Sequence, residues 1–168
     1  MRTVTVALLL VTLLSWPTAA RAQPPSAEPN PLLGTWTLNV TKSNIDYAPL
    51  PRHESRTYRA AQNNGMIFSV EGTDGAGVPF AYGTTAAVDG NEYPMPGTGT
   101  RNGGDAVSWT LVDPNTVDAV VKRLGDIVNS VRLSVSTDGM VLTITENGTN
   151  TAGEPTQGVR VYDRQEAR

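Results

Sequence analysis

The chain has 168 residues, with 13 basic and 16 acidic side chains, no cysteine and one histidine. The lack of cysteine excludes disulfide scaffolds, thiol catalysis and cysteine-built metal sites, and a single histidine excludes a multi-histidine metal site within one chain. A formal charge of −3 gives no overall attraction to nucleic acid or to anionic lipid, so we expect no nucleic-acid partner.

The N-terminal segment has the pattern of an export signal. A short positive start, Met1-Arg2, precedes an apolar run that ends near Trp16, and Ala20-x-Ala22 fits a signal-peptidase site. The apolar run is shorter than the roughly 20 residues of a comfortable membrane span. We therefore expect a cleaved signal peptide over residues 1–22, a periplasmic or extracellular protein, and no stable membrane span after processing. The alternative is an uncleaved anchor.

Residues 23–31 (QPPSAEPNP) contain four prolines, which predicts an extended tether. From residue 32 onward, strand-like runs alternate with turn signals such as Asn64-Gly65 and Asp138-Gly139, so we expect a single domain over residues 32–168. In chain order, the expected strands are residues 34–40, 53–60, 66–70, 78–87, 91–95, 105–112, 116–123, 127–136, 140–146 and 157–164. This spacing predicts an all-β fold, a single antiparallel up-and-down β-barrel of about eight to ten strands.

One segment, residues 116–132, also carries the helical period. Its apolar residues, among them Val117, Val121, Leu124 and Val128, recur at three- and four-residue spacing. Gly125 in the middle and the many β-branched side chains count against a helix. We expect two adjacent strands here, with one helix as the alternative.

The first and last expected strands carry family resemblances. Residues 34–39 (GTWTLN), then Lys42-Ser43, and the tail 161–165 (VYDRQ) resemble uncharacterised bacterial secreted proteins that are similar to lipocalins. The resemblance spans most of the mature chain and implies a calycin-type barrel, while saying almost nothing about activity. In such barrels a Gly-x-Trp motif opens the first strand, which implies that Trp36 plugs the closed end with about 200 Å² of apolar surface.

The last strand also resembles the closing strand of fatty-acid-binding proteins, where an Arg-x-Tyr pair points inward and holds a ligand carboxylate. That resemblance implies ligand-binding roles for Arg160 and Tyr162, and for Arg132 on the strand third from the end. Residues two apart share one face of a strand. Burial preference favours the opposite register, with Val159 and Val161 facing the core. Both registers stay open.

The chain departs from fatty-acid-binding proteins after the first strand. Those proteins place a helix–turn–helix lid there, whereas residues 41–52 offer about a dozen positions, and Pro49 and Pro51 block a helix. We therefore expect a barrel mouth that is open or closed by loops.

Three functions fit these features. The favoured one is an exported barrel that binds a small apolar or amphipathic molecule in its interior, without a cofactor or metal. The second is an interaction or inhibitor module with a filled barrel and a functional loop at residues 93–104. The least favoured is a lyase or isomerase that uses one desolvated carboxylate as base, because the sequence shows no acidic residue paired with an arginine or tyrosine in a cleft.

Overall fold

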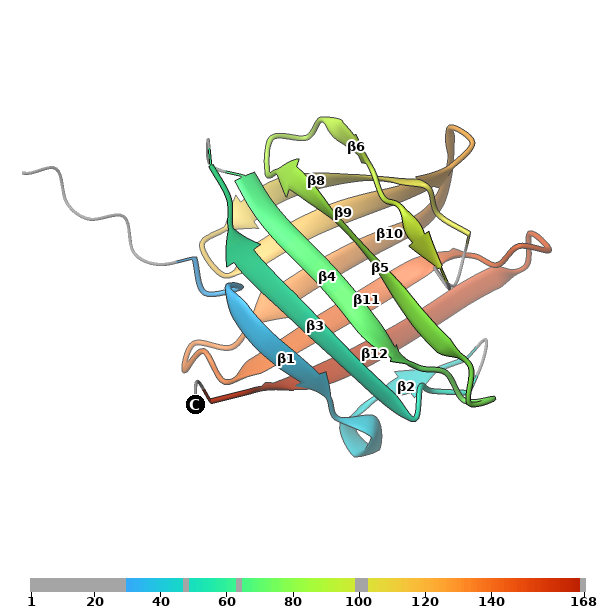
Figure 1. Cartoon of the computed structure of the whole chain (residues 1–168), viewed down its shortest axis with the longest axis horizontal. Helices are drawn as coiled ribbons and strands as arrows, with labels where there is room; N and C mark the ends of the chain where they lie inside the picture. Colours follow the sequence, from blue (N-terminus) through green and yellow to red (C-terminus); the bar gives the residue numbers. More distant parts are fainter. Residues whose placement is uncertain (1–29, 47–48, 63–64, 99–102, 167–168) are drawn as a thin grey trace, which may run out of the picture.

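The strands form a nearly closed, all-β antiparallel barrel (Figure 1). Buried and exposed side chains alternate along them, so one face of the sheet lines the interior. The computed structural model describes residues 30–46, 49–62, 65–98 and 103–166. The expected signal peptide at residues 1–22 and nearly all of the expected tether at 23–31 lie outside the described residues, so both stay predictions.

The described residues contain no α-helix, and their strands follow the expected ranges closely. The elements are β1 (Gly34–Leu38), the 3₁₀ turn η1 (Val40–Lys42), β2 (Asn44–Ile45), β3 (His53–Ala60), β4 (Gly65–Thr73), β5 (Pro79–Ala87), β6 (Glu92–Pro94), β7 (Gly97–Thr98), β8 (Ala106–Asp113), β9 (Thr116–Arg123), β10 (Asp126–Val135), β11 (Val141–Thr149) and β12 (Pro155–Arg164).

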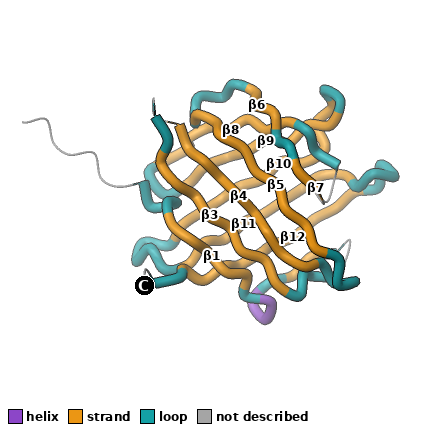
Figure 2. Tube along the Cα trace, in the orientation of Figure 1, coloured by secondary structure: helices purple, strands orange, loops and turns teal. Residues whose placement is uncertain are grey.

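The first and last long strands pair with each other. The sheet order is β6-β8-β9-β10-β11-β12-β1-β3-β4-β5-β7, and β1 meets β12 with Trp36 opposite Arg164. In Figure 1 the strands β3, β4 and β5 cross in front of β10, β11 and β12 at a steep angle, as expected for tilted barrel strands. The ladder ends at β6 on one side and at β7, which lies against β5 in Figure 2, on the other. The continuous segment 92–98 bridges these two edges, because β6 pairs with β8 and β7, three residues further along the chain, pairs with β5. The backbone N–H of Gly83 on β5 also donates a hydrogen bond to the carbonyl of Pro96 at 3.3 Å.

The ambiguous segment forms two strands, β9 and β10, as expected. A tight turn joins them, in which both Leu124 (φ +53°) and Gly125 (φ +91°) are left-handed. This is the geometry that a two-residue hairpin requires for its twist to match that of the strands. The helical spacing is a coincidence of two strands whose buried residues, such as Val117 and Ala119 on β9, alternate.

Trp36 is fully buried in the main hydrophobic core, beside the chain segment that enters the barrel. Its indole Nε1 donates a hydrogen bond to the carbonyl of Leu32 at 2.9 Å. The Arg164 guanidinium lies 4.0 Å above the indole ring and donates to the carbonyls of Pro31 and Leu33. The first strand, the last strand and the entering segment are thus joined around one aromatic side chain.

The connection between β1 and β3 carries no helical lid in its described part. Asn39 caps the three-residue turn η1 by accepting a hydrogen bond from the Lys42 backbone at 3.1 Å. Ile45 of β2 then pairs with Gly158 of β12. Among the residues that the structure describes, no helix is long and apolar enough to cross a membrane.

Candidate functional site

The barrel interior holds a cluster of charged side chains, which we call the buried ion cluster. It consists of Glu54 and Arg56 from β3, Glu146 from β11, and Arg160 and Tyr162 from β12, and each is at most 6% exposed. Period-two alternation explains their direction, because each shares a face with large buried apolar neighbours on the same strand. The polar groups therefore occupy core positions.

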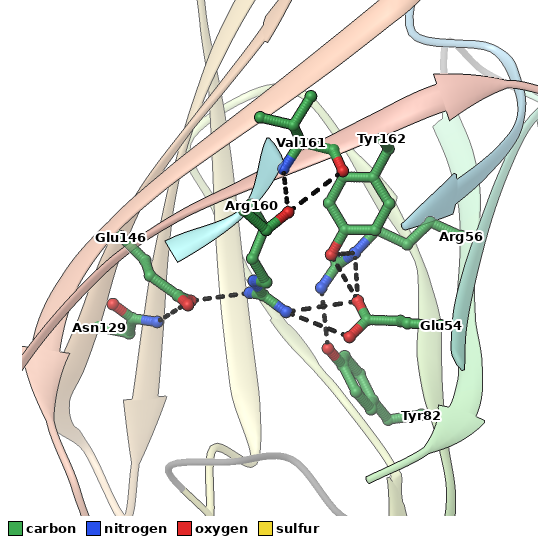
Figure 3. Close-up of polar contacts among 9 residues, drawn as sticks. Glu54, Arg56, Tyr82, Asn129, Glu146, Arg160, Val161 and Tyr162 are labelled. Atoms are coloured by element: carbon green, nitrogen blue, oxygen red, sulfur yellow. Dashed lines mark hydrogen bonds and ion pairs between the residues drawn. The ribbon is translucent and has the colours of Figure 1, made fainter. Parts of the chain in front are cut away.

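Glu54 is the centre of the buried ion cluster (Figure 3). Its Oε1 accepts hydrogen bonds from the Tyr162 hydroxyl at 2.6 Å and from Arg56 Nε at 2.8 Å. Arg160 Nη1 lies 3.3 Å from both Glu54 carboxylate oxygens, and its Nη2 donates to Glu146 Oε2 at 2.7 Å. Arg160 thus bridges the two glutamates.

Two further residues extend the cluster. The Tyr82 hydroxyl accepts a hydrogen bond from Arg56 Nη2 at 3.2 Å, and Asn129 Nδ2 donates to Glu146 Oε2 at 3.3 Å. A β-bulge between Ile127 and Asn129 shifts the register of β10 against β9 beside this residue. Irregular strand geometry therefore accompanies the polar contact.

Within the buried ion cluster, the guanidinium groups of Arg56 and Arg160 face the carboxylates of Glu54 and Glu146. Burial alone would lower the pKa of Arg160, but the oxygens of Tyr162 and Glu146 more than offset it, so its pKa lies well above the ordinary value. The pKa of Arg56 is raised in the same way, against burial, first by Tyr162. Burial raises the pKa of the Tyr162 phenol, which keeps this group a neutral donor.

Stability alone gives a poor reason for such a cluster. Desolvating charged groups is so unfavourable that well-packed apolar residues of similar volume are often at least as stabilising as a buried ion network. Ionisable groups gathered in an interior are, in contrast, common at sites that bind or react. The buried ion cluster is therefore a candidate functional site.

A cavity of about 70 Å³ adjoins the cluster. Three aromatic residues, Phe68, Tyr82 and Trp109, form part of its wall, with the ring centroids of Phe68 and Trp109 5.4 Å apart. Aliphatic side chains of β8, β9 and β10 line another part, and Met95 and Gly104 also contribute. The wall is thus mainly apolar, as in most small-molecule sites.

The polar wall of the cavity contains Arg56, Asn129, Glu146 and Arg160. Three buried polar atoms of cavity-lining residues have no hydrogen-bond partner: Trp109 Nε1, Asn129 Oδ1 and Arg160 Nε. Leaving a buried donor or acceptor unpaired costs about 1–3 kcal/mol. Two of the three atoms, on Trp109 and Arg160, are donors, so this wall is short of acceptors.

The structure places two of the three expected site residues together. Arg160 and Tyr162 both point inward, so the Arg-x-Tyr register holds and Val159 and Val161 lie on the outer side. The burial preference of valine is overridden because Glu54 and Glu146 pair with the arginine. Whether these residues contact a ligand stays a prediction.

The expectation that Arg132 lines the interior is wrong. Its side chain is 57% exposed and forms a two-pronged ion pair with Asp118, with Nε 2.7 Å from Oδ1 and Nη2 2.8 Å from Oδ2. The physical reason is alternation, since Val131 and Leu133 face the cavity and the residue between them must face outward.

The buried Tyr162 and the exposed Arg132 should respond differently to substitution. Tyr162→Phe should lower the free energy of unfolding by about 1.5–3 kcal/mol, because it deletes a buried hydrogen bond to a carboxylate while keeping the ring. Arg132→Ala should cost less than about 1 kcal/mol, as exposed ion pairs do. Urea unfolding followed by tryptophan fluorescence measures both. Equal losses would contradict the assigned orientations.

Comparison with known proteins bears on the fold. No protein-family model matches the chain, and no curated protein matches it. The solved structures that are similar include the wild-type fluorescent protein UnaG, with 15% identity and a TM-score of 0.54 over 79% of this chain and 96% of that one. Rv2717c from M. tuberculosis is also similar, with 14% identity and a TM-score of 0.50 over 81% and 94% of the two chains.

The class that fold and comparisons define is an all-β, nearly closed antiparallel barrel. At such low identity the likeness concerns the fold alone. Among the described residues, no group of three or more histidine, cysteine, aspartate or glutamate side chains is placed to hold a metal ion.

Proposed function

We propose that this protein is an exported binding protein, of the bacterial secreted lipocalin-like kind that its sequence resembles, and that it holds a small, mainly apolar molecule inside the barrel. One observation carries the proposal: a cavity with an aromatic and aliphatic wall meets a buried ion cluster and unpaired donors at its polar side. Binding sites for small molecules combine these features, with apolar surface for affinity and a few polar groups for orientation.

Export is supported by the pattern of residues 1–22, and the interior supports binding. Mass spectrometry of the protein, purified from the exported fraction without denaturant, tests the proposal. We expect a stoichiometric small molecule to leave the protein on unfolding. An interior that never retains or takes up any small molecule would contradict it.

The size of the cavity sets a condition on binding. At about 70 Å³ it is smaller than the roughly 150 Å³ that hold benzene in an engineered cavity, and well below the roughly 300 Å³ of a typical ligand pocket. Met95 is the side chain best suited to make room. It is buried in the cavity wall, and methionine is unbranched and adaptable. Binding therefore involves displacement of Met95.

Met95→Ala should accordingly raise the affinity for toluene, an apolar probe, by about tenfold, an advantage of about 1.4 kcal/mol. Met66→Ala is the matched control, because Met66 is equally buried in the core but does not line the cavity. Both variants lose stability through a large-to-small core change. Toluene binding is measured by NMR titration. An equal gain in both variants would show that loosening of the core, rather than the cavity, takes up the probe.

The small cavity is also the one observation that favours a second candidate, an interaction module with a filled barrel. Its expected loop, residues 93–104, is described except for 99–102. If neither the unaltered protein nor Met95→Ala takes up toluene, the filled barrel becomes the better account.

A further inference from the structure

Three polar atoms of cavity-lining residues have a hydrogen-bonding capacity that the described residues leave unused. They are the indole Nε1 of Trp109, the Nε of Arg160 and the amide Oδ1 of Asn129. Their side chains come from three different strands, β8, β12 and β10, and each residue is at most 7% exposed. The atoms are therefore shielded from bulk solvent, and a molecule in the cavity is what can pair with them.

The neighbours of Asn129 on β11 hold its amide with the oxygen unpaired. Its Nδ2 donates to Glu146 Oε2 at 3.3 Å, which leaves Oδ1 without a donor among the described residues. Gly148 lies opposite Asn129 in the ladder between β10 and β11, and a Cβ at that position would lie only 2.9 Å from Oδ1. The glycine thus leaves the space that this orientation of the amide requires.

The unused capacity amounts to two donors, on Trp109 and Arg160, and one acceptor, on Asn129. A hydroxyl group carries the complementary set, because its oxygen has two lone pairs that accept and one hydrogen that it donates. An ether or ketone oxygen lacks that hydrogen, and a hydrocarbon has neither function. The hydroxyl is also a very small polar group, which suits a cavity of about 70 Å³ whose remaining wall is mainly apolar.

Resting on the proposed function, we infer that the ligand carries a hydroxyl group on its apolar body, as a phenol or an aromatic alcohol does, and that Trp109, Asn129 and Arg160 bind this hydroxyl. Trp109 Nε1 and Arg160 Nε donate to the hydroxyl oxygen, and the hydroxyl hydrogen is donated to Asn129 Oδ1. The three residues thereby determine specificity, since a hydrocarbon of the same shape leaves all three atoms unpaired.

Phenol and toluene test this inference, since they have nearly the same shape and differ by a hydroxyl in place of a methyl group. A purely apolar cavity favours toluene, because burial of an unpaired hydroxyl is unfavourable. We expect the unaltered protein to bind phenol at least as tightly as toluene in an NMR titration. Phenol should also move the indole N–H signal of Trp109 downfield, which toluene does not do. The indole N–H of Trp36, already bonded to Leu32, is the internal control.

Trp109→Phe supplies the second arm of the test, because it keeps an aromatic ring in the cavity wall and removes the N–H donor. The ratio of phenol affinity to toluene affinity should fall by about fivefold, the loss expected for one hydrogen bond. Trp36→Phe is the matched control. It makes the same change at a buried indole that does not line the cavity, so the ratio should stay unaltered.

The outcomes separate the two proposals. Phenol binding to the unaltered protein more weakly than toluene would overturn the hydroxyl inference and leave the binding function standing, and this result does not depend on any variant folding. If neither compound binds to the unaltered protein or to Met95→Ala, the binding function fails and takes the inference with it. An unchanged affinity ratio in a folded Trp109→Phe would remove Trp109 from the residues that bind the hydroxyl.

Discussion

Glu54→Gln is expected to lower the free energy of unfolding by about 3–5 kcal/mol, the cost of breaking a buried ion pair by removing one partner. The substitution keeps the shape of the side chain but leaves Arg56 and Arg160 with Glu146 as their remaining carboxylate in the cluster. Because domains of this size are stable by only about 5–15 kcal/mol, much of the total would be lost. Urea denaturation followed by circular dichroism measures the change.

The control for this prediction is Glu71→Gln on the neighbouring strand β4, whose side chain is exposed. Surface changes of this kind usually stay within about 0.5 kcal/mol. If the two glutamine variants unfolded at the same urea concentration, Glu54 would have to be solvated or mobile, and a cluster centred on it would be wrong.

Trp36→Ala should also lower the free energy of unfolding by about 3–5 kcal/mol. The indole is fully buried, donates to Leu32 and supports the Arg164 guanidinium 4.0 Å above its ring. The alanine variant removes a large apolar surface and the platform that joins β1 to the end of β12. The same urea titration, read by circular dichroism because a fluorophore is lost, measures the effect.

Val159→Ala is the matched control, since Val159 lies on β12 near the same seam but is 39% exposed. It should lose far less stability than Trp36→Ala. Comparable losses would mean that the contact between the first and last strands depends on general apolar content and not on the buried indole.

Most of the fold follows from local chemistry in the sequence. The Asp-Gly pairs at 89–90 and 138–139 mark turns after β5 and β10, and both Gly90 and Gly139 adopt the positive φ angles that glycine tolerates. The alternation of apolar and polar side chains then indicates how far each long strand extends. The short strands β2 and β7 could not be predicted in this way, because two residues are too few to show an alternation. These strands form because they pair with β12 and β5.

The site was harder to predict, because its residues look like surface residues. Strand β3 (HESRTYRA) reads as polar, and its charged side chains would ordinarily face water. The available signal was Tyr58, a large residue that shares a face with Arg56 and Glu54 through period two. On β11, Glu146 likewise follows Leu142 and Ile144 at the same spacing.

What no single strand reveals is the pairing between strands. Arg160 is acceptable inside only because glutamates from two other strands meet it, and sequence position gives no register between β3 and β12. The outward direction of Arg132, in contrast, follows from its place between Val131 and Leu133, whose side chains face the interior, and it is opposite to the direction that the family resemblance implies.

The most direct test of the central claim, that the interior of the barrel holds a small, mainly apolar molecule, is a crystal structure of the protein with toluene. We predict the toluene ring against Phe68 and Trp109, with Met95 displaced. Toluene found only outside the barrel, above an interior still filled by Met95 and its neighbours, would contradict the account.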